Sequence, residues 1–89
     1  MKEENYKEYR IEIHPQPKTG DNTQVFLGVW KDDHKVFSVW EKISGTESRS
    51  VTTSVTDSLE QKGLVRVKKM IDDRDFKDGA EYEFWESAN

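Results

Sequence analysis

The sequence of 89 residues predicts one small α+β domain, in which an antiparallel sheet of about five strands carries one helix on one face. Residues 24–43 are the most apolar stretch of a polar chain, and they alternate as paired strands do. Residues 57–62 have a helical composition, and the glycine that follows them stands where helices commonly end. The expected order of elements is β-β-β-α-β-β.

The stretch from 24 to 43 predicts a central hairpin. Its connection, residues 32–34, is polar and short, which suits a turn containing a residue with left-handed backbone geometry. A three-residue loop pairs Lys31 with Lys35 and Trp30 with Val36. Both faces of this hairpin are apolar, which is typical of a central pair of strands.

The remaining elements follow from shorter patterns. Residues 1–7 are polar, and we expect them to fray, as we do residues 87–89. Apolar and charged residues alternate over 9–13, which predicts a strand that stops at Pro15. Residues 15–23 predict a loop with two prolines and a glycine.

The second half of the chain leaves one alternative open. Residues 49–62 predict a helix that is capped at Gly63, but residues 50–56 also contain strand formers. A strand there, followed by a single helical turn, would make the protein a small all-β barrel. Residues 64–71 and 80–86 then predict the last two strands, which are joined by an acidic loop anchored by Phe76. The expected core consists of Ile11, Ile13, Val25, Leu27, Val29, Phe37, Val39, Leu59, Tyr82 and Phe84.

Composition excludes several classes of site. The chain has no cysteine, so disulfides, thiolate metal sites and cysteine nucleophiles are excluded. The polar start and the lack of a long apolar run predict a cytoplasmic protein with no membrane segment. Residues 32–34, Asp-Asp-His, are ordinary turn composition, and we expect no metal and no cofactor there. No catalytic residue pattern is present, so we expect the protein not to be an enzyme.

The second face of the predicted hairpin carries Phe26, Trp30 and Trp40, with Gly28 between them. One interpretation is an aromatic platform that stacks bases or binds a peptide. The other is a second layer of core covered by a loop or a terminus, because large rings are usually buried.

The charges in the second half of the chain are segregated. Lys62, Arg66, Lys68 and Lys69 form a basic cluster, and Asp72, Asp73, Asp75 and Asp78 begin an acidic stretch. If residues 64–71 and 80–86 pair as a hairpin, opposite charges face each other across it. Two functional alternatives remain: the acids imitate phosphates on a partner, or the basic residues bind phosphates.

Residues 59–65, with the sequence LEQKGLV, resemble the passage from recognition helix to basic wing in winged-helix regulators of the MarR type. The resemblance continues at Asp73 and Arg74 and covers about a quarter of the chain. It implies that the helix and the strand after it approach DNA. The strands expected over residues 8–43 replace the preceding helices of that fold, and the net charge of −4 is not that of a DNA-binding domain.

The leading hypothesis is therefore a small non-enzymatic protein-binding module. Size and composition favour a bacterial or phage accessory or inhibitor protein that occupies a surface of its partner. The alternative is a nucleic-acid-binding module that uses the aromatic face and the basic cluster. A third hypothesis is a homodimer formed through a sheet edge or the aromatic face.

Overall fold

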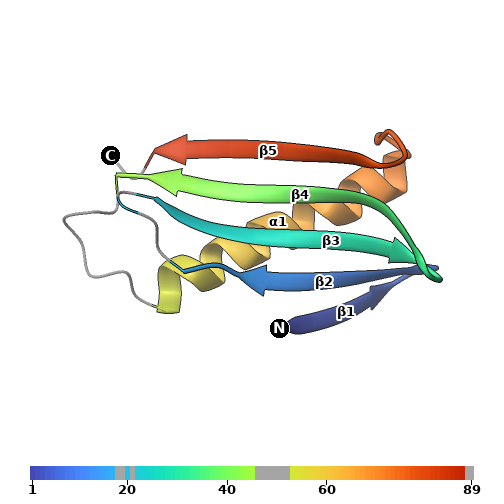
Figure 1. Cartoon of the computed structure of the whole chain (residues 1–89), viewed down its shortest axis with the longest axis horizontal. Coiled ribbons are helices and arrows are strands. Elements are labelled where there is room, and N and C mark those ends of the chain that lie inside the picture. Colours follow the sequence, from blue (N-terminus) through green and yellow to red (C-terminus); the bar gives the residue numbers. More distant parts are fainter. Residues whose placement is uncertain (18–19, 21, 46–52, 88–89) are drawn as a thin grey trace.

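The computed structural model describes residues 1–17, 20, 22–45 and 53–87, and it confirms the α+β class. Its elements are β1 (Lys2–Tyr6), β2 (Tyr9–Pro15), β3 (Thr23–Lys31), β4 (His34–Ser44), α1 (Thr53–Asp73) and β5 (Ala80–Ser87). In this part of the chain, five strands form one open sheet, and a single helix crosses one side of it (Figure 1). The alternative of a closed all-β barrel is therefore wrong.

The strands lie in the sheet in the order of the chain, β1-β2-β3-β4-β5. The first four are antiparallel neighbours, whereas β5 runs parallel to β4 because α1 returns the chain to the starting end of the sheet. The helix contacts β2, β3 and β4. We call the side of the sheet that carries α1 the helix face and the other side the open face.

The order of elements differs from the expected one at both ends of the chain. Residues 1–7, which we expected to fray, contain the edge strand β1. Residues 64–71, expected as a strand, belong to α1. The expected number of strands, five, still agrees with the structure, because β1 was not expected and the strand expected at residues 64–71 is absent. Of the expected helix 49–62, residues 49–52 lie outside the described residues, and so do residues 88–89 of the expected C-terminal fray.

Residues 64–71 are helical because four apolar side chains fall on one face of α1 and cover the sheet. Leu59, Leu64, Val67 and Ile71 are all less than 8% exposed. Val65, only two positions from Val67, is 68% exposed. A strand would place these two valines on the same face, whereas helical periodicity separates them. The β-branched composition that suggested a strand is overridden by burial against β3 and β4.

Gly63 does not cap a helix, because it lies in the middle of α1 and has no positive φ. A Cβ atom at this position would lie 2.6 Å from Cδ1 of Leu27 and 3.1 Å from Cγ of Glu41. The glycine therefore lets the helix approach the sheet closely.

The helix ends ten residues later in a Schellman motif. Arg74 has a φ of 54°, and its N–H donates to the carbonyl of Ile71, 3.2 Å away. The N–H of Asp75 donates to the carbonyl of Met70 at 2.9 Å. These are the two bonds of that motif, with a left-handed residue just past the last helical turn. Phe76 follows and stacks on Phe37 at 4.5 Å between ring centroids, so the expected aromatic anchor of this loop is confirmed.

The central hairpin has the expected pairing over most of its length. Leu27 pairs with Val39, and Val29 pairs with Phe37. Beyond Val29 the register shifts, so Trp30 pairs with Lys35 instead of Val36. The turn has two residues rather than three, because His34 already belongs to β4. Asp32 adopts the left-handed geometry expected of the turn, with a φ of 55°.

The strand β1 contains few apolar residues and is held to α1 mostly by polar side chains. On its helix face Lys2 donates to Glu60 at 2.7 Å, and Glu60 is only 4% exposed. Glu4 pairs with Lys68, and the Tyr6 hydroxyl donates to Asp72 at 2.8 Å. Hydrophobic periodicity does not detect a strand of this kind, which explains why the sequence suggested fraying.

The core lies between α1 and the helix face of the sheet. Eight of the ten expected core residues are buried there, and Tyr82 and Phe84 are half-buried on β5. The expectation missed Val36 and three residues of the helix. The buried residues that were missed are Val36, Leu64, Val67 and Ile71.

Candidate functional site: the aromatic patch of the open face

The three rings singled out in the sequence lie on the open face, away from α1. Phe26 and Trp30 come from β3 and Trp40 from β4, and all three are half-buried. Trp85 of β5 joins them on the same side of the sheet and is 52% exposed. We call Phe26, Trp30, Trp40 and Trp85 the aromatic patch. The rings are neither enclosed as a second core nor fully exposed.

The patch is arranged around the small residues at the centre of the sheet. Phe26 and Trp40 are cross-strand neighbours, with ring centroids 4.8 Å apart. Trp30 lies across Gly28, since its Nε1 would be 3.3 Å from a Cβ atom there. Gly28 in turn pairs with the buried Ser38. The gap expected at Gly28 is therefore closed by the neighbouring rings, and the patch forms a continuous surface over β3 and β4.

Three cations lie over the rings of the patch. The guanidinium of Arg10 is 5.6 Å from the centroid of Trp30, and Nζ of Lys35 is 5.2 Å from that of Phe26. Nζ of Lys42 is 5.1 Å from the centroids of both Trp40 and Trp85. Such cation–π contacts fix long side chains on the face without removing their charge.

Carboxylates alternate with these cations on the open face. Glu81 accepts a hydrogen bond from Nε1 of Trp40 at 2.9 Å, and Glu83 accepts one from Nε1 of Trp85 at 2.6 Å. The Trp85 hydrogen bond and the neighbouring Lys42 lower the pKa of Glu83. On β2, Glu12 lies 3.4 Å from the guanidinium of Arg10. The surface is therefore aromatic with both signs of charge interleaved, and it is not a basic groove.

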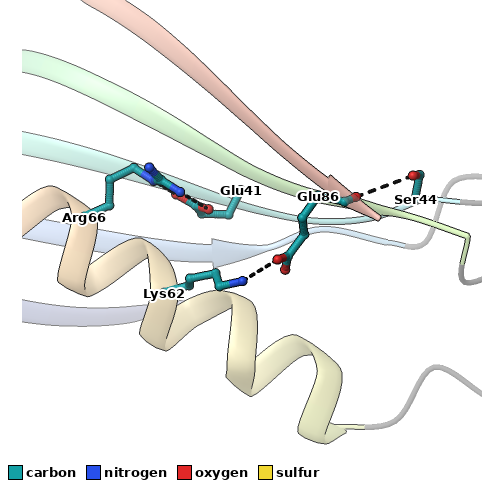
Figure 2. A network of polar contacts seen from close by, with 5 residues as sticks. All are labelled: Glu41, Ser44, Lys62, Arg66 and Glu86. Carbon is teal, nitrogen blue, oxygen red and sulfur yellow. Dashed lines mark hydrogen bonds and ion pairs between the residues drawn. The ribbon is translucent and has the colours of Figure 1, made fainter. Parts of the chain in front are cut away.

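The basic cluster lies on the other side of the molecule, on α1, and each of its members is ion-paired. Arg66 donates from Nε to Glu41 at 2.6 Å, and Lys62 pairs with Glu86 (Figure 2). Lys69 bonds Asp73 at 2.9 Å, which raises its pKa. The fourth member, Lys68, pairs with Glu4 of β1. Three of these ion pairs join the helix to strands, and the pair of Lys69 with Asp73 lies within α1. None of them joins the two strands of the expected hairpin.

The acidic stretch is dispersed in the same way. Asp72 is held by Lys7 and Tyr6, and these hydrogen bonds lower its pKa, with Lys7 the larger cause. Asp73 belongs to α1, and Asp78 lies 2.8 Å from Nε2 of His34 across the loop. Asp75 lies beside a groove between α1 and β5. Asp73 lines the same groove, whereas Asp72 and Asp78 are held by partners on other elements.

Within residues 1–17, 20, 22–45 and 53–87, no group of three or more histidine or acidic side chains is placed to hold a metal ion. No helix in this part of the chain is long and apolar enough to cross a membrane.

The sequence missed the cations over the rings, and it missed Trp85 as a member of the patch. Period-two alternation places Trp85 on the other face of its strand from Tyr82 and Phe84, but it does not indicate which strand lies next to β5. Arg10 likewise reaches Trp30 across the β2–β3 pair, and Lys42 reaches Trp85 across the β4–β5 pair, although Lys42 also lies over Trp40 of its own strand. Alternation along each strand does indicate which residues face outward. That indication locates the patch only when β5 is known to lie beside β4.

Comparison with protein-family models, with curated proteins and with solved structures finds no significant match to this chain.

Proposed function

We propose that the protein is a non-enzymatic binding module that docks on another protein through the aromatic patch. The observation that carries the proposal is the composition of the open face: four partly exposed rings with Arg10, Lys35 and Lys42 over them. Tryptophan and arginine are the residues most enriched among the few side chains that dominate binding energy at protein interfaces. By covering the surface of the partner that the aromatic patch binds, the protein would act as an accessory or inhibitor protein.

The charge pattern favours a protein partner over a nucleic acid. Glu12, Glu81 and Glu83 lie among the rings, where a phosphate backbone would meet them. A protein surface can satisfy both signs of charge at once. The four basic residues of α1 are paired with acids and lie on the opposite side of the sheet, so they do not extend the patch.

One observation keeps a nucleic-acid function as the second candidate. The cations Arg10, Lys35 and Lys42 lie over the same rings that would stack bases, and an aromatic sheet face with cations is a known solution for single strands. For this candidate to hold, a nucleic acid must bind in spite of the repulsion between its phosphates and the neighbouring glutamates.

Tryptophan fluorescence separates the two candidates. The protein is titrated with single-stranded and duplex oligonucleotides at low and at moderate salt. Stacking on Trp30 or Trp40 would quench the emission, and added salt would reverse the quenching. We expect no change at either salt concentration. Salt-sensitive quenching would overturn the protein-binding proposal in favour of the second candidate.

Affinity capture from cells of the source organism then tests the surface directly with an open-face variant and a control variant. The open-face variant combines Lys35→Glu with Trp85→Gln, both at exposed positions. The control is Val65→Gln on the outer side of α1, which is 68% exposed. For the partner isolated with wild type, we expect the open-face variant to bind at least about tenfold more weakly. Equal binding by wild type and both variants would contradict the proposal.

A further inference from the structure

The outer edge of β5 is a long and regular sheet edge. Among the described residues β5 has one strand neighbour, β4, with which it pairs over its whole length without a register shift. Natural proteins commonly protect such an edge with a proline, a bulge or charged side chains. The strand reads AEYEFWES: it has no proline and no register shift, and its charged side chains are all glutamates. Among the residues that the structure describes, β5 is an edge strand with no further strand beside it (Figure 1).

A groove runs beside this edge on the helix face. Because α1 lies over β2, β3 and β4, it leaves the apolar side of β5 only half covered. The groove between α1 and β5 has a volume of about 300 Å³. A strand added to β5 would lie about 4.8 Å beyond it, and every second side chain of that strand would project toward this groove. The groove is lined in part by Lys69, Met70, Asp73, Asp75, Tyr82 and Phe84.

The charges of β5 decide which strand fits. Glu81 and Glu83 project from the open face of the strand and are exposed, and β5 has no basic residue. Two copies of β5 related by a twofold axis would place these glutamates on the same face of the joined sheet as those of the second copy, with no basic residue of either strand between them. Like charges on neighbouring strands are destabilising, whereas opposite charges are stabilising. The edge therefore disfavours a second copy and favours a basic strand.

We propose that the β5 edge binds an extended, basic segment of another protein by β-strand addition. Apolar side chains of the segment enter the α1–β5 groove beside Met70 and Tyr82, since Arg66 already covers the ring of Phe84. Lysines or arginines at the alternate positions meet Glu81 and Glu83 on the open face. This surface is distinct from the aromatic patch and does not rest on the function proposed for that patch. It predicts a recognition sequence in which apolar and basic residues alternate.

The test uses a capped eight-residue peptide of alternating valine and lysine, with a valine–glutamate peptide as its acidic counterpart. Both are first shown to be monomeric by sedimentation, as is the protein. Titration is followed by amide shifts in the NMR spectrum. We expect the shifts to concentrate in residues 80–87, in residues 66–73 of α1 and at Asp75 just after it. The basic peptide should bind at least about tenfold more tightly than the acidic one.

Two substitutions separate this edge from general electrostatics. Glu81→Gln with Glu83→Gln keeps the acceptor oxygens for Trp40 and Trp85 but removes both charges. The control, Glu3→Gln with Glu8→Gln, makes the same change of net charge in the opposite edge strand β1 and in the turn that follows it. We expect about a fivefold loss for the first pair and no loss for the second. N-methylation removes the backbone N–H donors along one edge of the peptide. On the edge that faces β5 it should abolish binding, and on the other edge it should not.

Three results would overturn the proposal. The first is equal binding of the basic and acidic peptides, and the second is a shift map confined to the aromatic patch or to β1. The third is self-association: the protein alone forms a dimer, and diluting it shifts the amide signals of residues 80–87. A second copy of the protein would then be the occupant of the β5 edge.

Discussion

Arg66 on α1 and Glu41 on β4 form an ion pair beneath the helix, with Nε of the arginine 2.6 Å from Oε2 of the glutamate. The Glu41 side chain is only 3% exposed, whereas that of Arg66 is 35% exposed. The arginine also lies over the ring of Phe84, 3.8 Å from its centroid. The arginine therefore neutralises a buried carboxylate (Figure 2) and, through the ring of Phe84, also contacts β5.

Removing the arginine leaves the buried carboxylate without its counter-charge. We expect Arg66→Ala to lower the free energy of unfolding by about 3 kcal/mol in urea denaturation. The double variant Glu41→Met with Arg66→Met replaces the pair with apolar side chains of similar length, and it should recover most of that loss. If the double variant is as unstable as Arg66→Ala, the loss of stability in Arg66→Ala does not come from the unpaired carboxylate of Glu41.

Gly63 should resist replacement by alanine even though alanine is the better helix former. Alanine gains about 1 kcal/mol of helix propensity, but its Cβ atom would clash with Leu27 and Glu41. We expect Gly63→Ala to be destabilising by about 1–2 kcal/mol overall. In a Leu27→Val background, which lacks the clashing Cδ atoms, the cost should fall. The control Gln61→Ala at an exposed helical position should be neutral, and a stabilising Gly63→Ala would contradict the close approach of helix and sheet.

Two valines test whether residues 64–71 are helical. Val67 is fully buried and Val65 is 68% exposed, although they are separated by a single residue. We expect Val67→Ala to lower the free energy of unfolding by about 2 kcal/mol and Val65→Ala to change it by less than about 0.5 kcal/mol. Equal effects at the two positions in thermal or urea unfolding would indicate the strand that the sequence alone suggested.

The contact of Asp72 with Lys7 and Tyr6 should make stability depend on pH in the acid range. Folding lowers the pKa of Asp72 below its ordinary value of 3.8, so the contact stabilises the fold above that pH. The stabilisation is lost as the pH falls through the lower pKa of the folded state. We therefore expect the difference in stability between wild type and Asp72→Asn to be constant near neutral pH and to shrink below about pH 4. A difference that persists at pH 2 in urea unfolding would contradict this origin.

The elements that local pattern could predict are those whose neighbours are close in the chain. The hairpin of β3 and β4 needs only a short turn, so Leu27 opposite Val39 and Phe26 opposite Trp40 followed from period-two alternation. The register failed only past Val29, where a bulge absorbs one residue.

The errors arise where tertiary contacts decide the conformation. Val65 and Val67 suggest a strand by composition, and only the burial of Val67 against the sheet makes the segment helical. β1 is attached through ion pairs to α1, some sixty residues away, such as Lys2 with Glu60. The aromatic patch was half predictable for the same reason. Its rings on β3 and β4 follow from the hairpin, whereas Trp85 joins them only because β5 lies beside β4.

The most direct test of the proposed function is site-specific photo-crosslinking in cells of the source organism. A photoreactive amino acid replaces Lys35 on the open face in one experiment and Val65 on the outer side of α1 in another; both positions are exposed. We predict that position 35 gives a discrete protein adduct, that the adduct weakens when Trp85→Gln is added, and that position 65 gives no such adduct. An adduct from position 65 alone, or a nucleic-acid adduct from position 35, would contradict the assignment of the aromatic patch as a protein-binding surface.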